Sequence, residues 1–457
     1  MEPALDVPDR FVASAESQAE PDAAWWDGYG DPVLSDLIRR AAHANRDVKV
    51  AAERVRAARA GEVVSKSWLW PSVGLSVSGT DQRSGYDGRV KQVVPNAADA
   101  RGAVGGIDVA WEIDLAGRLR AGVQASQAET LAAEHGARGV RLLVLTDVAA
   151  NYFTLVGALR QLDTMRAIAA SQDETLRLVT ARHRVGLATP FDVERAQTDA
   201  SRTRAAIPPL ETLAAVSRHR VAVLIGDQAY KAAAIAPSGS DLVVPATKPG
   251  QPAALLERRP DLLAAKASID AANARRQQAA AEWFPRLFLS ALFGAEGLHV
   301  DGVGLGSARY THVAALLAMP IFNAGRTQAI NDIAESEQRE AVLRYEGAVA
   351  RALEDVENAL IAVADERRRS DLMQSASASA EAALGRAQSL YDRGQVDLLP
   401  LLDAQRVRLA VRVSANDSHT QLLLDSVQLY KALGGGWQVF EAAERPSTDG
   451  TSRAPGA

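Results

Sequence analysis

The amino-acid sequence contains two related halves, which we call the first and the second repeat. Trp70-Pro71-Ser72-Val73 corresponds to Phe284-Pro285-Arg286-Leu287 at an offset of about 214 residues. Further along the chain, Leu115-Ala116-Gly117-Arg118 corresponds to Asn323-Ala324-Gly325-Arg326 at an offset of about 208. A single change of offset indicates one deletion, and deletions are tolerated in loops. We therefore expect two equivalent halves, each with an exposed loop between its two matching segments.

Each repeat contains segments with the period of two that is typical of β-strands. Apolar residues alternate with small or polar ones along three segments: Val73, Leu75 and Val77; Ile107, Val109, Trp111 and Ile113; Leu287, Leu289, Ala291 and Phe293. A fourth segment, from Val313 to Ile321, is apolar almost throughout. We predict one β-hairpin in each repeat, at about 71–115 and about 285–322.

The rest of each repeat is predicted to be helical. Apolar residues spaced three and four apart form a heptad seam, which makes long helices pack nearly parallel in a left-handed coil. Helices over 121–184 and 327–393 would be about 95 to 100 Å long. The returning helices, over 190–230 and 398–433, are too short alone, so we expect helices over 34–67 and 253–282 to stack on them end to end. The seam comprises Leu145, Val148, Tyr152, Leu155, Leu159 and Leu162, and again Leu353, Val356, Leu360 and Val363.

Each long helix ends in a short reversal around a glycine, Gly186 or Gly394. Glycine takes the left-handed conformation at the end of a helix at little cost. After the first reversal, Thr189 is suited to cap a helix that begins with Pro190 and has Asp192 near its positive end. The pattern predicts a tight helix–turn–helix in each repeat.

The two reversals differ in chemistry. In the second, Asp397 is the candidate cap and Pro400 falls in the first helical turn. A glycine and a proline require no more than a turn. Leu187 is harder to explain in this way, because an apolar side chain at a tip has no local partner, and it favours a docking surface.

The composition excludes several classes of function. The chain has no cysteine, which rules out disulfides, thiolate metal sites and thiol catalysis, and its net charge of -5 gives no reason to expect nucleic acid. The seven histidines lack ligand spacing, and the glycines at 302–306 are not followed by the Lys-Ser/Thr of a nucleotide loop. We expect no metal, no cofactor and no enzymatic activity.

Three features of the sequence concern a membrane. No stretch of about 18 consecutive residues is apolar, so a transmembrane helix is not expected. The N-terminus lacks the basic and apolar regions of a signal peptide, which fits either a cytoplasmic protein or a processed form. Four strands of about 9 to 11 residues would span a bilayer but cannot close a barrel, and open edges are not tolerated in lipid. Strands in a membrane would therefore require the chain to oligomerise around an axis.

Several segments resemble the outer-membrane efflux proteins of the TolC family, in particular the OprM/NodT-type subgroup. They follow the family's order from WWDGYGDPVLSDLI at residue 25 to Trp437, and include AWEIDLAGRLR (110–120), ERRPDLLAAKASIDAANA (257–274), PIFNAGR (320–326), LLPLLDAQR (398–406) and LYKALGGGW (429–437). The resemblance implies a membrane α+β fold: a homotrimer whose 12-stranded outer-membrane β-barrel, four strands per chain, continues as a long coiled α-helical barrel. It also implies a passive exit duct that meets a periplasmic adaptor (membrane fusion protein) and an inner-membrane pump, often of the resistance-nodulation-division type.

The resemblance also implies two functional sites. Val185-Gly186-Leu187 matches the VGL motif at the family's periplasmic helix tips, which docks on the adaptor, and Arg393-Gly394-Gln395 stands at the same place in the second repeat. Leu399 and Asp403 match leucine and aspartate rings that narrow the family's periplasmic entrance, and are the candidate gate. Without the family, Asp403 would be interpreted as a solvated helix residue and Leu399 as a packing residue. Around a three-fold axis, three such carboxylates would attract cations.

Together these expectations divide the chain into five parts. They are an N-terminal extended segment (1–24), the first repeat (25–230, tip at 185–190), a linker in the equatorial region (231–252), the second repeat (253–437, tip at 393–400) and a flexible tail (438–457). The implied location is the outer membrane, in contact with its lipid, with the helical barrel in the periplasm. The subgroup usually begins with a lipidated cysteine, so we expect either a chain cut after it or anchoring by the barrel alone. The alternative interpretation is a soluble coiled-coil scaffold without transport activity, which the heptads allow and the paired strands do not support.

Overall fold

The computed structural model describes residues 3, 7–13, 21–82, 100–239, 242–246, 248–300 and 303–444. These residues form two compact units, which do not coincide with the two repeats. The strand unit takes its described residues from Met1–Pro3, Arg54–Glu134 and Ala264–Tyr345, and the helical unit from Ala4–Glu53, His135–Leu263 and Glu346–Ala457. Each unit therefore contains equivalent pieces of both repeats.

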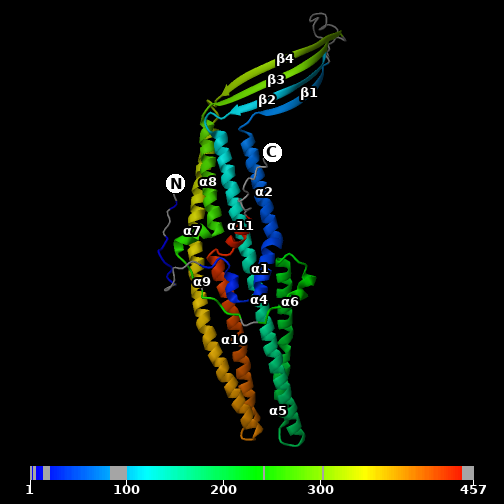
Figure 1. Ribbon diagram of the computed structural model, residues 1–457, viewed down its shortest axis with the longest axis vertical. Coiled ribbons are helices and arrows are strands. Elements are labelled where there is room, and N and C mark those ends of the chain that lie inside the picture. Colours follow the sequence, from blue (N-terminus) through cyan, green and yellow to red (C-terminus); the bar gives the residue numbers. More distant parts are fainter. Residues whose placement is uncertain are drawn as a thin grey trace, which may run out of the picture. The chain divides into compact units, whose positions relative to one another are not determined.

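The strand unit contains one four-stranded antiparallel sheet in the order β1-β2-β3-β4 (Figure 1). Its strands are β1 (Ser72–Gln82), β2 (Ala100–Ile113), β3 (Arg286–Val300) and β4 (Val303–Ala318). They contain 11, 14, 15 and 16 residues, which is at or above the length that spans a bilayer. β1 and β2 lie within the range expected for the first hairpin and β3 and β4 within that for the second. The expected loop of the first hairpin, 83–99, lies outside the described residues.

The register places the alternating apolar residues of β1, β2 and β3, together with Val313 of β4, on one face of the sheet. Val73 lies opposite Val109, Val109 opposite Ala291, and Ala291 opposite Val313. Directly opposite residues of antiparallel strands point to the same face. The alternation seen in the sequence is therefore one continuous apolar surface across the sheet.

Four helices lead into and out of the strands. α2 (Arg46–Ser67) and α8 (Pro260–Ala280) precede the two hairpins, and α4 (Arg118–Arg184) and α9 (Arg326–Asp392), both 67 residues long, follow them. Within the strand unit α2 lies against α4, where the Ser65 and Ser126 hydroxyl oxygens are 2.5 Å apart. α8 lies against α9, where the Gln338 amide donates to the Asn273 carbonyl oxygen at 2.5 Å.

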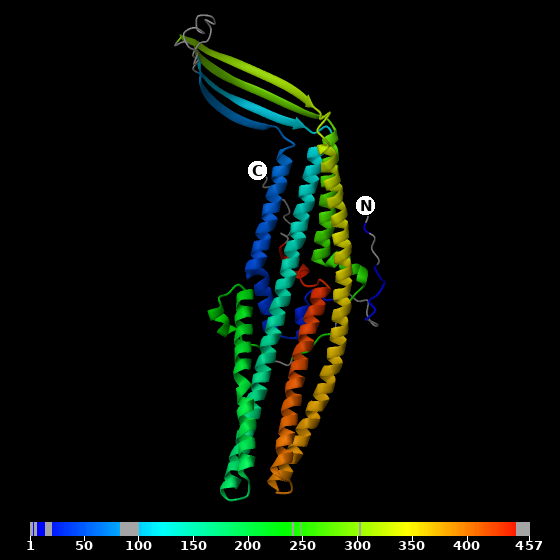
Figure 2. The ribbon, with the colours of Figure 1, turned by 180° about the vertical axis from the view of Figure 1, so that it is seen from behind.

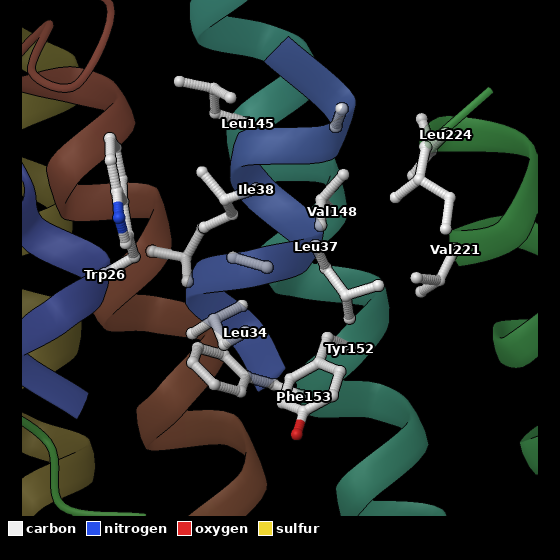
Figure 3. Close-up of a cluster of buried hydrophobic side chains, with 14 of the residues drawn as sticks. Trp26, Leu34, Leu37, Ile38, Leu145, Val148, Tyr152, Phe153, Val221 and Leu224 are labelled. Carbon is white, nitrogen blue, oxygen red and sulfur yellow. The ribbon is translucent and has the colours of Figure 1, made fainter. Parts of the chain in front are cut away.

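The core of the helical unit joins α4 to the N-terminal helices and to the returning helix of the first repeat. Side chains from α1 (Pro32–Ala44), α4 and α6 (Ile207–Leu224) converge there (Figure 3). Tyr152 is fully buried and donates from its hydroxyl to the Asp31 carboxylate at 2.5 Å. Burial and this neighbouring carboxylate raise the pKa of Tyr152 above its ordinary value. Four residues of the α4 heptad seam, Leu145, Val148, Tyr152 and Leu155, thus pack into this core.

α4 is the one described helix with a window long and apolar enough to cross a membrane. The window has a mean hydropathy of 1.6 and 56% of it is buried inside the structure. Core helices of soluble proteins meet the same criterion, and here Leu145, Val148 and Tyr152 face the core in Figure 3.

Three helices that the sequence predicts as continuous are broken. The segment 34–67 forms α1 and α2, separated at Asn45, whose side-chain oxygen accepts from the backbone N–H of Asp47 at 2.7 Å and so caps α2. The segment 190–230 forms α5 (Pro190–Ala205) and α6, and α6 ends before Gly226. Pro208 and Pro209 lack the N–H groups that a continuous helix would use. The segment 253–282 is broken before Pro260 into α7 (Leu255–Arg258) and α8, whereas α10 (Leu398–Ala432) is continuous.

The predicted flexible tail is wrong for its first seven residues, which form α11 (Gln438–Glu444). Phe440 is buried and its ring stacks on Trp26 at 5.7 Å. Gly434 and Gly436 take φ of 71° and 114°, which turns the chain back after α10. The indole N–H of Trp437 donates to the Arg258 carbonyl at 3.2 Å. The glycines allow the chain to reverse after α10, and buried Phe440 packs α11 against the helical unit. Residues from 445 onward lie outside the described part.

Candidate functional site

The first tip joins α4 to α5 through a left-handed glycine. Gly186 has a φ of 77°, and the backbone N–H of Gly186 and Leu187 donate to the carbonyls of His183 and Arg182 at 2.9 and 2.8 Å. These two bonds satisfy carbonyls at the end of α4 that the helix itself leaves free. The His183 ring nitrogen Nδ1 lies 2.9 Å from the Ala188 carbonyl oxygen, which closes the loop further.

A reciprocal cap begins the returning helix of the first tip. The Thr189 hydroxyl accepts from the Asp192 backbone N–H at 3.2 Å, and the Asp192 carboxylate accepts from the Thr189 backbone N–H at 2.9 Å. The bonds from Thr189 hold the pKa of Asp192 below its ordinary value, because they stabilise the charged carboxylate. Both ends of this turn are therefore fixed by hydrogen bonds.

Apolar side chains project from this fixed turn. Leu187 is 71% exposed, and Val185 and Phe191 are exposed to a similar degree. The apolar patch formed by these three residues, which we call the tip patch, lies on the loop and on the first turn of α5. Exposed apolar groups clustered on a stiff support are typical of a surface that binds another protein.

The second tip has the same backbone turn and a different surface. Gly394 has a φ of 70°, and Gln395 donates from its backbone N–H to the Leu390 carbonyl at 2.9 Å. Asp397 occupies the capping position, as expected, but its side chain makes no capping hydrogen bond. Arg393 and Gln395 are exposed and polar. The second tip therefore lacks both the apolar patch and the reciprocal cap of the first.

The two candidate gate residues share one exposed face of α10. Leu399 is 53% exposed and Asp403, one helical turn later, is also exposed. Leu398, Leu401 and Leu402 point the other way and are buried. The buried residues Leu398, Leu401 and Leu402 thus account for the packing of α10 near the tip. Leu399 and Asp403 take no part in that packing.

The two helical hairpins pack against each other next to their tips (Figures 1 and 2). A small core combines Val179 of α4, Tyr391 of α9 and Leu401 of α10 with residues of both turns. The Arg182 guanidinium lies over the Tyr391 ring, 4.7 Å from its centre. Farther from the turns, the Arg406 guanidinium of α10 donates hydrogen bonds from Nε and Nη2 to the Asp199 carboxylate of α5. The contacts from Nη2 are 2.9 Å long.

The structure brings both tips together at one end of the helical unit, with the candidate gate residues Leu399 and Asp403 directly after the second tip. The sequence analysis did not identify Phe191 as a site residue. Its position directly after Pro190, in the first turn of a predicted helix next to the tip, is a signal that the sequence contains. The Arg406–Asp199 pair was missed as well, because its association depends on the packing of two hairpins about 207 residues apart. In the described part of the chain, no group of three or more His, Asp or Glu side chains could hold a metal ion.

Comparison with known proteins identifies close relatives across nearly the whole chain. A family model described as "Outer membrane efflux protein" matches residues 37–227 and 252–435. The pyoverdine export outer membrane protein OpmQ of Pseudomonas aeruginosa is 32% identical over 433 residues, covering 94% of this chain and 90% of OpmQ. The outer membrane protein OprJ of the same organism is 30% identical over 442 residues, covering 95% and 91%.

Solved structures agree with these relatives. The outer-membrane channel OprN has a TM-score of 0.86 at 28% identity, covering 96% of this chain and 98% of the OprN chain. CusC, whose structures concern transmembrane channel formation, has a TM-score of 0.81 at 26% identity, covering 95% and 99%. These neighbours are trimeric channels, and four antiparallel strands with long helices in this chain confirm the predicted fold class and homotrimer.

The predicted function and location are also confirmed. The relatives are outer-membrane channels of efflux pumps, which supports an outer-membrane efflux channel and gives no support to the soluble scaffold. The chain belongs to the outer membrane efflux protein family.

Proposed function

We propose that three protomers of this chain form a passive exit duct, which docks on a periplasmic adaptor through its helix tips and is narrowed at the entrance by Leu399 and Asp403. The observation that carries the docking role is the tip patch, three exposed apolar side chains on a turn that hydrogen bonds hold at both ends. A pre-organised apolar surface binds without a further ordering cost. The adaptor would therefore cover Val185, Leu187 and Phe191.

The second tip would contribute less to docking. Arg393 and Gln395 offer charge and hydrogen bonds at exposed positions, where each contact is worth little. Its weaker cap leaves the start of α10 with fewer restraints than the start of α5. We assign the second tip to the entrance of the duct, next to the proposed gate residues. There it would contact only the edge of the adaptor.

The gate would arise from the trimer. Three copies of Leu399 around one axis would form an apolar constriction, and three copies of Asp403 a ring of carboxylates one turn away. Rings of acidic side chains attract cations, and apolar rings resist water and ions. The exposure of both residues on a helix whose packing face is occupied elsewhere supports this role.

The cargo would be small toxic molecules such as drugs, selected by the partner pump. The names of the relatives refer to different cargoes, including pyoverdine for OpmQ, cations for CusC and toluene for TtgI. Because related ducts serve such different cargoes, the cargo would be selected by the partner pump, of the resistance-nodulation-division type, and not by the duct. The duct itself would carry out no chemistry and need no cofactor. The two repeats, 25–230 and 253–437, would each supply one hairpin of each kind, joined by the equatorial linker 231–252.

Substitution at the tip patch tests the docking role. Leu187→Ser should lower the amount of native adaptor that co-purifies with the channel by about tenfold or more, because each of three tips loses an apolar anchor. The equivalent second-tip change, Gln395→Ser, should have a smaller effect. Val243→Ser, at an exposed apolar position of the linker, is the matched control and should have none. Equal adaptor recovery with Leu187→Ser and Val243→Ser would remove the tip patch from the interface.

A further inference from the structure

Exposed aromatic side chains lie where the strands of the sheet give way to helices. Trp70 directly precedes β1, Phe284 precedes β3 and Phe322 follows β4, and all three are exposed. Aromatic residues gather at the level of the lipid headgroups in proteins that cross a membrane. The chain is an outer-membrane protein with its helices in the periplasm, so this end of the sheet lies at the headgroups of the periplasmic leaflet.

The first repeat neutralises its own arginine at this boundary. Arg118 is the first residue of α4, and its Nη2 donates to both oxygens of the Glu112 carboxylate at 2.8 Å. Two residues after Glu112, the Asp114 carboxylate accepts from the backbone N–H of Arg120 at 2.9 Å. The first repeat therefore supplies a carboxylate for each donor group at the start of its long helix.

The second repeat keeps the arginine and lacks both carboxylates. At the offset of about 208 residues, Arg326 corresponds to Arg118, and Pro320 corresponds to Glu112. Phe322 stands where the first repeat has its second carboxylate. Arg326 is exposed, and no described residue accepts a hydrogen bond from its guanidinium. An acidic group from outside the chain can therefore take the place that Glu112 has in the first repeat.

The turn before α9 does not use the Arg326 side chain. The Asn323 carbonyl accepts from the Arg326 backbone N–H at 3.1 Å, and the Asn323 amide donates to the Thr327 hydroxyl at 2.6 Å. Gly325, with a φ of 83°, reverses the chain. The backbone and two other side chains thus hold this turn, and the guanidinium is left for a different partner.

The surroundings of Arg326 indicate which acidic group that partner carries. Ile321 is 97% exposed and Phe322 is 88% exposed, in the same stretch between β4 and α9. A soluble anion would gain nothing from these apolar side chains, whereas a phospholipid offers acyl chains together with a phosphate. The planar guanidinium matches two phosphate oxygens at once.

We propose that Arg326 binds the phosphate of a phospholipid in the periplasmic leaflet, while Ile321 and Phe322 contact the acyl chains of the same lipid. We call these three residues the rim site. A lipid with a net negative headgroup fits better than a zwitterionic one, because no second cation competes with Arg326 for the phosphate. The trimer has three rim sites, one per protomer, and the first repeat has none because Glu112 already occupies Arg118.

Native mass spectrometry of delipidated trimers in detergent tests the rim site, with phosphatidylglycerol as the probe. Wild-type trimers should take up three phosphatidylglycerol molecules with an apparent Kd about fivefold lower than that of Arg326→Gln trimers. Arg46→Gln is the matched control and should bind like the wild type. Arg46 is also an exposed arginine at the first position of a helix, α2, and it lies in the helical unit. The measured mass shows that each variant is a trimer.

A second substitution removes the vacancy and keeps the arginine. Pro320→Glu restores the carboxylate of the first repeat, so it should pair with Arg326 and weaken phosphatidylglycerol binding as much as Arg326→Gln does. Pro320→Gln makes the same change of backbone without the charge, and should weaken binding less than half as much on a logarithmic scale. Equal effects of Pro320→Glu and Pro320→Gln would contradict the phosphate contact.

Two competing ligands separate a lipid from a free anion. Diacylglycerol with the same chains lacks the phosphate, so it should bind equally to the wild type and to Arg326→Gln. Inorganic phosphate lacks the chains, and at the concentration of the lipid it should not displace phosphatidylglycerol. Displacement by inorganic phosphate, or equal phosphatidylglycerol binding by wild-type, Arg46→Gln and Arg326→Gln trimers, overturns the proposal. Neither result depends on the roles given to the tips or the gate.

Discussion

At the scale of single residues, equivalent positions of the two tips differ in chemistry, and this difference supports the different roles that we propose for them. Leu187 and Gln395 occupy the same place after a left-handed glycine, and both are exposed. Thr189 and Asp192 hold the first turn with a reciprocal cap, whereas Asp397 makes no side-chain bond in the second. An apolar side chain on the stiffer turn is suited to docking, and polar groups on the looser turn are not.

The reciprocal cap makes the first tip sensitive to acid. The pKa of Asp192 is lowered in the folded protein, so its contribution is complete above its ordinary value of 3.8 and is lost as the pH falls through the lower folded value. We expect hydrogen-exchange protection of residues 189–193, corrected for intrinsic rates, to be constant from neutral pH to about pH 5 and to fall below about pH 4. Asp192→Asn should remove this dependence. The start of α10 provides the internal comparison, and an equal loss of protection there would contradict the assignment.

At the scale of secondary-structure elements, the sequence predicts types better than boundaries. Period two in the strands and the heptad seam in the long helices are strong local signals, and β1 to β4, α4 and α9 appear where they predict. The breaks at Asn45 and Ala206 were missed because each depends on a cap or a proline pair inside a pattern that is otherwise helical. α11 was missed because its stability depends on Trp26, more than four hundred residues away.

Close contact between α4 and α10 depends on one glycine. A Cβ at Gly157 would collide with the Thr420 side chain. We expect Gly157→Ala to lower the apparent Tm of the detergent-solubilised trimer, since overpacking costs about 1 to 3 kcal/mol and exceeds the gain of about 0.5 to 1 kcal/mol from helix propensity. Thr420→Ala should recover at least half of the loss.

The same helix offers a matched control for this contact. Gly136 of α4 has no atom within 4 Å of a Cβ built there, so Gly136→Ala should leave the Tm unchanged or raise it. A loss of stability with Gly136→Ala as large as with Gly157→Ala would show that the effect is not helix packing.

At the scale of the whole molecule, the repeat explains more than any single motif. It predicts two strand hairpins and two helical hairpins, and four strands in a membrane then require several chains. It does not predict that the compact units mix both repeats, because that depends on which elements pack together in space. The tips and the gate residues could be named from the sequence only through family resemblance. Their exposure is a property of the packed hairpins, in which Leu401 and Leu402 take the inner face of α10 and leave Leu399 and Asp403 on the outer one.

The central claim, a trimeric duct gated by Leu399 and Asp403, is tested most directly by single-channel conductance in planar lipid bilayers. Purified wild-type trimers should conduct weakly, and Leu399→Ala with Asp403→Ala should raise the conductance by about twofold or more, because both side-chain rings are cut back at the narrowest point. Val407→Ala with Asp417→Ala, an apolar and an acidic residue farther along α10, is the matched control and should change it little. An unchanged conductance of the Leu399 and Asp403 double variant would contradict the gate.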